Sequence, residues 1–261
     1  MLSFLPVGAK IYISSLAFLI GLFLGSGLNC LSYRMAHGLK WSSGRSKCPS
    51  CGHTLAPRDL VPLFSWLFLK GKCRYCKEKI SARYPISELV MALSCTALLW
   101  RFGIGWELAV VWVLLGCLFC LSLIDMETLT IPDRFLLIPA VCRAAELLWE
   151  GGLSGLWRGV YPALLLGGAV LLLVLIMDKV LKKESMGGGD IKLLFVLGLF
   201  FELPQCLFLL VTACIVGIIA AVVVMRLEKD TPFPFGPSIS IAAVVTLLIG
   251  ERVTSWYLGL F

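Results

Sequence analysis

The chain has 261 residues, of which 59% are hydrophobic and 15% charged, and its net charge is +7. A soluble domain of this length carries more surface charge, so the composition excludes an ordinary soluble protein and indicates a polytopic membrane protein. The basic excess is no sign of nucleic-acid binding, because the Lys and Arg residues follow the membrane topology derived below. We therefore expect membrane lipid, and no nucleic acid, among the partners.

Several apolar segments approach the ~20 residues that a helix needs to cross the hydrocarbon core, and the fourth and sixth of the eight predicted spans are shorter. We therefore predict an all-α polytopic membrane protein with about eight transmembrane helices. The first segment lacks the basic n-region and the cleavage site of a signal peptide, so we expect it to be a retained span. The predicted spans are 11–31, 86–101, 107–124, 135–149, 159–177, 191–203, 205–225 and 237–258.

The distribution of basic residues predicts the orientation of these spans. With the N-terminus outside, the inner loops are 32–85, 125–134, 178–190 and 226–236. Together with Lys192 at the membrane edge, they hold 18 of the 23 Lys and Arg residues, whereas the outer segments hold four. Cytoplasmic loops carry the excess of Lys and Arg in membrane proteins, so we predict that both termini lie outside.

One sizeable polar insertion, residues 32–85, lies between the first two spans. It carries 11 Lys and Arg residues against two acids, Asp59 and Glu78. A segment of this size buries too little apolar surface to be stable unaided, so a cross-link is expected. We divide the chain into a first transmembrane helix (1–31), this insertion (32–85) and a seven-helix membrane core (86–261).

The insertion contains two Cys-x2-Cys pairs, Cys48 with Cys51 and Cys73 with Cys76, separated by 21 residues. This spacing is typical of a zinc ribbon with four thiolate ligands. The alternative is two disulfides, which rarely persist in the reducing cytoplasm where the topology places the loop. Four thiolates leave no open coordination position, so we predict one structural zinc ion per chain.

Two aspartates at the membrane edge are candidates for chemistry, since an Asp near the bilayer centre costs ~3 kcal/mol. Asp125 ends the third predicted span and Asp190 begins the sixth, and these spans run in opposite directions, so both aspartates lie at cytoplasmic ends. Two carboxylates held close together share a proton, and one then acts as base and the other as acid. Such a pair can activate water against a peptide carbonyl.

Other readings of the two aspartates stay open at this point. An Asp at a helix start is often only an N-cap, and membrane carboxylates also form ion sites and proton relays. A transporter or proton-relay protein, with Asp125 and Asp190 as ion-binding carboxylates, is therefore the alternative function. A non-catalytic scaffold, in which the insertion binds a cytosolic partner, is a third.

Three glycines, Gly187, Gly188 and Gly189, lead directly into Asp190. Glycine adopts backbone conformations that are closed to other residues, and it permits the close approach of another chain. The positive end of the following helix favours the ionised form of Asp190. We therefore predict that the three glycines form an active-site loop that acts as a hinge for Asp190.

Four segments, in order along the chain, resemble the type IV prepilin peptidases, which are bifunctional leader peptidases and N-methyltransferases. The first is GSGLNCLSYRM (25–35), and the second is the cysteine-containing segment 48–90. The others are LIDMETLTIPDRF (123–135) and MGGGDIKLL (186–194), in which Asp125 and Asp190 match the family's two catalytic aspartates.

The resemblance implies an intramembrane aspartic endopeptidase of the bacterial inner membrane, with its active site near the cytoplasmic face. Its substrates would be prepilins or pseudopilins of type IV pilus or type II secretion systems, cleaved after the Gly that ends a basic leader. The enzyme would then methylate the new N-terminal residue, usually Phe, with S-adenosylmethionine. Gly71 and Lys72 match a family segment linked to methyl transfer, and Glu88 is a third candidate for that step.

Overall fold

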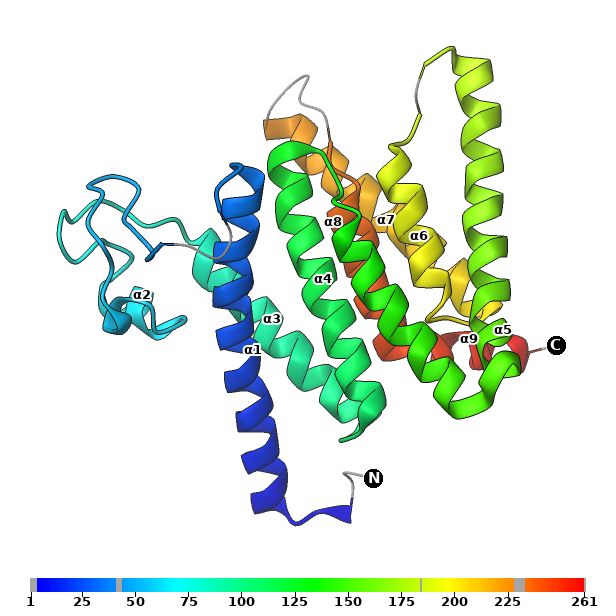
Figure 1. Ribbon diagram of the computed structural model, residues 1–261, viewed down its shortest axis with the longest axis horizontal. Coiled ribbons are helices and arrows are strands. Elements are labelled where there is room, and N and C mark those ends of the chain that lie inside the picture. Colours follow the sequence, from blue (N-terminus) through cyan, green and yellow to red (C-terminus); the bar gives the residue numbers. More distant parts are fainter. Residues whose placement is uncertain (1–3, 41–43, 184, 228–232, 261) are drawn as a thin grey trace. The chain divides into compact units, whose positions relative to one another are not determined.

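The computed structural model describes residues 4–40, 44–183, 185–227 and 233–260, with side chains omitted for 224–227. Glu184 and residues 228–232, in two of the predicted inner loops, lie outside the described residues. The chain divides into two compact units, Met1–Leu108 and Ala109–Phe261. Within the described ranges the regular structure is helical, with isolated β-bridges in place of a sheet (Figure 1).

The first unit is built on an antiparallel pair of helices, α1 (Val7–Ala36) and α3 (Arg83–Phe102). The two backbones approach closely at small residues: a Cβ on Gly21 would lie 2.5 Å from the Cα of Ala92. Asn29 donates a hydrogen bond of 2.8 Å to the hydroxyl of Ser87. In membranes, where no hydrophobic force drives helices together, such close packing and interhelical hydrogen bonds hold a helix pair.

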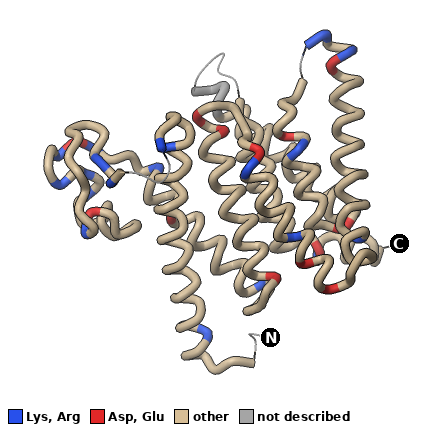
Figure 2. Tube along the Cα trace, viewed as in Figure 1, with Lys and Arg blue, Asp and Glu red and all other residues tan. Residues whose placement is uncertain are grey.

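The insertion between α1 and α3 contains two short helices, η2 (Pro57–Asp59) and α2 (Phe64–Phe68). Two isolated antiparallel bridges, Lys47 with Thr54 and Lys72 with Lys79, close its two cysteine-containing turns. Most of its Lys and Arg residues are exposed. Figure 2 shows where basic residues occur along this part of the chain.

The second unit contains the most apolar helices. Helix α4 (Trp106–Thr128), which begins at the end of the first unit, and helix α8 (Gly236–Val245) contribute fully buried side chains such as Leu121 and Ile239. The Ser240 hydroxyl on α8 donates to a backbone carbonyl of α4, that of Leu118, at 3.4 Å. The remaining elements are α5 (Arg134–Leu181), α6 (Gly188–Gly198), α7 (Leu203–Leu227), the π-helical turn η3 (Thr246–Gly250) and α9 (Glu251–Leu258).

Helices α5 and α6 lie side by side and pack through glycines (Figure 1). A Cβ on Gly198 of α6 would lie 2.4 Å from the Cα of Ala163 on α5, and one on Gly167 would lie 2.9 Å from the Phe195 ring. Because the backbones touch at these points, the direction of α6 relative to α5 is fixed. That direction matters, because Asp190 lies in the first turn of α6.

A buried ion pair holds the other end of α6. The guanidinium of Arg143 donates to the Glu146 carboxylate at 2.7 Å and to the carbonyl of Leu199, just after α6, at 3.3 Å. The Glu146 side chain is almost completely buried. A charge inside a membrane protein is costly unless it is paired, and here the pair also satisfies a carbonyl at the end of a helix.

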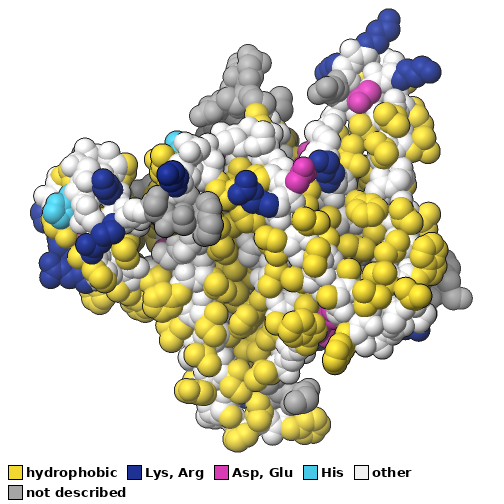
Figure 3. Space-filling view, viewed as in Figure 1, with side chains coloured by type: hydrophobic (Ala, Val, Ile, Leu, Met, Phe, Trp, Pro, Cys, Tyr) yellow, Lys and Arg dark blue, Asp and Glu magenta, His cyan; other side chains and the backbone are white. Residues whose placement is uncertain are grey.

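The predicted membrane fold is confirmed. Six helices in the described residues are long and apolar enough to span a membrane. One of them, α5, contains two predicted spans, because it bends at Gly152, whose φ of 57° breaks the helical backbone. Helix α6 corresponds to the sixth predicted span, although it is short. Apolar side chains cover the outside of the helices (Figure 3), as expected for a multi-pass membrane protein.

Substitution of Gly198 by Ala tests the contact between α5 and α6. We expect a loss of about 1–3 kcal/mol in the free energy of unfolding, because the added methyl group overpacks against Ala163. Gly168→Ala is the matched control, since a Cβ at Gly168 meets no atom within 4 Å. Thermal unfolding of the purified protein in detergent measures both, and equal unfolding temperatures for the two variants would contradict the packing described.

Candidate active site

Asp125 lies in the last turn of α4 and is held by the start of α8. Its side chain is buried, with 5% of the residue exposed. The backbone N–H of Gly236, the first residue of α8, donates to Oδ2 of Asp125 at 3.0 Å. The positive end of a helix is a favourable partner for a carboxylate. The α8 N-terminus therefore orients Asp125 and stabilises its ionised form.

Gly236 was not among the residues that the sequence pointed to. A Cβ at this position would lie 2.7 Å from Oδ2 of Asp125, so the carboxylate occupies the space that any side chain would need. The available signal was the stretch Phe-Pro-Phe-Gly-Pro (233–237) at the start of an apolar helix. Its partner, however, is 111 residues away in the sequence.

Asp190 is the third residue of α6, and its backbone N–H donates to the carbonyl of Gly187 at 3.1 Å. Its Oδ1 atom is buried, and in the described part of the chain it has no hydrogen-bond partner. An unpartnered buried oxygen costs free energy, so it is usually explained by a function or by a ligand. Asp190 therefore has an open acceptor position inside the protein.

The second unit brings the two aspartates together at one end of the helices. Two contacts join the loop after Asp125 to the start of α6: Ile131 packs against Gly189, and Asp133 pairs with Lys192 at 2.7 Å. The sequence-based expectation that the aspartates lie at matching helix ends agrees with this geometry. Their chemical role stays a prediction.

The three glycines before Asp190 differ from the expected hinge. None of them has a positive φ; Gly187 is extended, with φ −65° and ψ 138°, and Gly188 and Gly189 already belong to α6. The glycine requirement here comes from space. A Cβ on Gly189 would lie 2.9 Å from the Cβ of Ile131, whereas one on Gly188 would meet nothing within 4 Å.

The four cysteines of the insertion form one cluster in the first unit. Their Sγ atoms all lie within 4.8 Å of one another, and those of Cys48 and Cys76 are 3.9 Å apart. All four thiols are free. Four thiols at tetrahedral metal–sulfur distances of ~2.3 Å would be ~3.8 Å apart, so the cluster fits a metal ion.

Backbone groups of the two turns tune these thiols. Hydrogen bonding to the backbone of Cys51 outweighs burial and lowers the pKa of Cys48 to about 6, which favours the thiolate that a metal requires. At Cys76 a backbone hydrogen bond from Glu78 lowers the pKa, but desolvation and the neighbouring thiols outweigh it and raise the pKa to about 12. Without a metal the cluster therefore retains protons, which an ion would displace.

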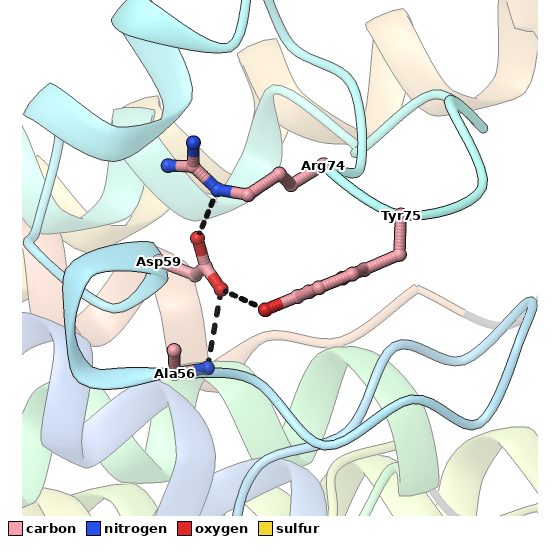
Figure 4. Close-up of polar contacts among 4 residues, drawn as sticks. All are labelled: Ala56, Asp59, Arg74 and Tyr75. Atoms are coloured by element: carbon pink, nitrogen blue, oxygen red, sulfur yellow. Dashed lines mark hydrogen bonds and ion pairs between the residues drawn. The ribbon is translucent and has the colours of Figure 1, made fainter.

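A carboxylate cross-links the two halves of the insertion (Figure 4). Asp59 accepts hydrogen bonds from Nε of Arg74 at 2.7 Å, from the Tyr75 hydroxyl at 3.0 Å and from the backbone N–H of Ala56 at 3.1 Å. Burial raises the pKa of Asp59, but these donors outweigh it and the net pKa is lowered. The stabilisation is therefore fully present at neutral pH and is lost as the pH falls below about 4.

The three candidates for methyl transfer lie in the first unit. Gly71 has a φ of 68°, and a Cβ added at this position would lie 2.9 Å from the ring of Trp66. Lys72 is exposed. Glu88 is buried, and its Oε2 accepts a hydrogen bond of 2.7 Å from the backbone N–H of Leu63. Gly71 thus allows a left-handed backbone next to Trp66, and Glu88 ties α3 to the start of α2.

Two family models match the sequence of this chain. The bacterial peptidase A24 N-terminal domain matches residues 19–102, and the type IV leader peptidase family matches residues 112–222. The chain belongs to the type IV leader peptidase family. The family match confirms the resemblance identified from the sequence motifs.

Several curated proteins named prepilin leader peptidase/N-methyltransferase are similar along most of the chain. The one from Bacillus subtilis is 34% identical, covering 94% of this chain and 97% of its own. The one from Pseudomonas aeruginosa is 34% identical and covers 92% of this chain and 91% of its own. The one from Stutzerimonas stutzeri is 32% identical and covers 93% of this chain and 92% of its own. No solved structure gives a significant match.

The two matched family regions contain different groups of candidate residues. The N-terminal region contains the cysteine cluster, and the type IV leader peptidase region contains both aspartates. Gly236, which holds Asp125, lies beyond residue 222. Gly236 is thus a candidate positioning residue for Asp125 that the matched family region does not include.

Gly236→Ala tests that role. We expect leader-peptidase activity to fall about 10- to 100-fold. The methyl group of alanine would push the Asp125 carboxylate out of its position, and small displacements of a reacting group slow catalysis. The loss should appear in kcat with little change in KM. Gly168→Ala, with open space around its Cβ, should keep wild-type activity. Wild-type kcat in Gly236→Ala would show that the contact with Asp125 is not needed.

Proposed function

We propose that this chain is a prepilin leader peptidase and N-methyltransferase in which Asp125 and Asp190 are the catalytic pair. The observation that supports the proposal is the placement of two aspartates in the second unit, at the end of α4 and the start of α6, which the loop after Asp125 joins through Ile131 and Asp133. One is held by a helix N-terminus, and the other has a free buried oxygen. The names of the curated relatives supply the reaction that such a pair would perform.

The cleavage needs one ionised and one protonated carboxyl group around a water molecule. The ionised group removes a proton from the water as its oxygen bonds to the scissile carbonyl carbon, and the protonated group donates its proton to the carbonyl oxygen. The tetrahedral intermediate then breaks its C–N bond as the nitrogen takes up a proton. Because the two groups share a proton, acid and base roles belong to the pair. The N–H of Gly236 favours the charge on Asp125.

The substrate side follows from the resemblance to the family. We propose that the enzyme cleaves the basic leader of a prepilin or pseudopilin after Gly, before a hydrophobic helix that usually starts with Phe. A glycine before the cleaved bond has no side chain, so its carbonyl can approach the buried Asp125 side chain and the buried Oδ1 atom of Asp190 closely. The hydrophobic helix that follows can remain in the membrane.

Methyl transfer would follow on the amine that cleavage releases. That amine, with an ordinary pKa of ~7.7–8.0, must lose its proton before its lone pair attacks the methyl group of S-adenosylmethionine. The N–C bond forms, the S–C bond breaks, and S-adenosylhomocysteine leaves. Gly71, Lys72 and Glu88 remain our candidates for this step. The buried carboxylate of Glu88 is the one of the three that could accept a proton.

We propose a structural zinc ion on Cys48, Cys51, Cys73 and Cys76, one per chain. The Sγ separations fit a tetrahedral four-thiolate site, and such a site has no position for a substrate. Bound zinc would cross-link the two turns of a segment that has few buried apolar residues. The cross-link from Asp59 to Arg74 and Tyr75 would act in parallel.

We further propose the orientation predicted from the basic residues, with both termini outside and the insertion and aspartates on the cytoplasmic side of the inner membrane. The helix ends that carry Asp125 and Asp190 adjoin Arg134 and Lys192. The division into 1–31, 32–85 and 86–261 remains our functional division. The compact units of the structure divide at another point, after Leu108.

The first test replaces each aspartate separately. Asp125→Asn and Asp190→Asn should each lower the rate of prepilin leader cleavage by about 10³-fold or more, since each removes a group needed for proton transfer. Glu150→Gln, an exposed acid on α5, is the control and should retain wild-type cleavage. Near wild-type cleavage by either Asn variant would exclude the pair mechanism and would favour an ion-binding role for the carboxylates.

The second test concerns the metal. Protein purified without chelators should contain about one zinc ion per chain, and Cys73→Ser should lose it because three thiolates bind less tightly than four. Cys214→Ser, outside the cluster, should keep its zinc. We expect Cys73→Ser to reduce methyl transfer more than leader cleavage, because the aspartates lie in the other unit. Zinc-free wild-type protein, or equal loss of both activities at matched protein level, would contradict these assignments.

A further inference from the structure

The insertion has an exposed apolar face that its own fold does not use. Five large apolar side chains of α2 and of the residues just before it are exposed. Their exposed fractions run from 40% at Val61 to 83% at Phe68. The α2 outer face consists of Leu60, Val61, Phe64, Leu67 and Phe68.

The opposite side of α2 is fixed within the insertion. Nε1 of Trp66 donates to the carbonyl of Ile80 at 3.1 Å, and its ring packs against Gly71. Trp66 therefore points inward, and Phe64, Leu67 and Phe68 point outward. An exposed patch of large apolar side chains on an otherwise polar, basic segment is typical of an interaction surface.

The helix pair α1–α3 shows where this face lies relative to the charged end of α3. The start of α2 is tied to α3 by the hydrogen bond from the N–H of Leu63 to Glu88, and Glu88 packs against Gly25 in α1. Glu88 lies five residues inside α3 from Arg83, which is ~8 Å at 1.5 Å per residue. Arg83 marks the polar end of that helix. The start of α2 is therefore attached to α3 within ~8 Å of the charged helix end, on its apolar side.

That depth matches the position of an interfacial helix. Such helices lie with their apolar face buried ~5–10 Å into the boundary between headgroups and acyl chains, and basic residues flank them. The residues after α2 provide the basic flank, as Figures 2 and 3 show for the insertion. The exposed lysines there are Lys70, Lys72, Lys77 and Lys79.

Charge indicates the kind of surface that α2 meets. The insertion has 11 Lys and Arg residues and two acids, and one of these, Asp59, is already paired with Arg74. Basic segments next to a membrane bind anionic lipid headgroups. We propose that the α2 outer face lies in the interfacial layer of an anionic bilayer, with its apolar side chains among the upper acyl chains and the lysines on the headgroups. The insertion is then held on the membrane surface by lipid as well as by α1 and α3.

The test places a fluorescent amino acid at position 68, or at 67 in a second variant, in the full chain. Each variant is reconstituted into nanodiscs that contain lipids with a nitroxide near the top of the acyl chain. The control carries the fluorophore at Arg45, which is exposed and next to Gly44, whose carbonyl binds Arg34 near the polar end of α1. We expect quenching of about twofold or more at positions 67 and 68, and little at 45, as for an interfacial helix.

Lipid composition and cross-linking separate the possible occupants. Quenching at 68 should be stronger in discs of phosphatidylcholine with phosphatidylglycerol than in phosphatidylcholine alone, and equal quenching would overturn the anionic assignment. A photo-reactive phenylalanine at 68 should cross-link to lipid. Cross-links to residues 109–261, to a second copy or to an added prepilin would each overturn the proposal, as would weak quenching equal to that at 45.

Discussion

The hydrogen bond from the α8 N-terminus to Asp125 is the constraint on which the proposed chemistry depends. It joins two helices that are 111 residues apart in sequence, and it places a positive helix end against a buried carboxylate. Only glycine leaves room for this contact, because the Asp125 oxygen lies where a Cβ would be. A buried carboxylate without such a partner would be costly in a membrane protein. The donor that holds Asp125 is thus a backbone N–H, which, unlike a side-chain donor, cannot move away by changing rotamer.

Asp190 is positioned by a different set of contacts. Helix α6 touches α5 backbone to backbone at Gly198, and Arg143 holds the carbonyl that follows the helix. At the other end, Gly189 packs on Ile131 in the loop that follows Asp125. The two aspartates are therefore linked through one short loop as well as through the helix packing. Such contacts fix the position of a reacting group to within a fraction of an ångström, which catalysis requires.

The sequence predicted much of this because its signals are local or periodic. Long apolar runs identified the spans, the Cys-x2-Cys spacing identified the cysteine cluster, and the positions of Asp125 and Asp190 at matching helix ends followed from topology. It did not predict the contact of Gly236, because a bond between distant residues leaves no pattern nearby. It also assigned Gly187, Gly188 and Gly189 to a hinge, although close packing at Gly189 is what the structure shows. The two readings differ because a glycine signals either backbone freedom or lack of space.

The central claim is that the two aspartates act as one unit on one water molecule. A double-mutant cycle tests it directly: leader cleavage is measured for Asp125→Asn, Asp190→Asn and the variant with both changes. If both carboxyl groups are needed for the same step, either single substitution already abolishes catalysis by the pair. The double variant should then cleave no more slowly than either single variant. Losses that multiply, so that the double variant is slower by the product of the two single effects, would contradict the account.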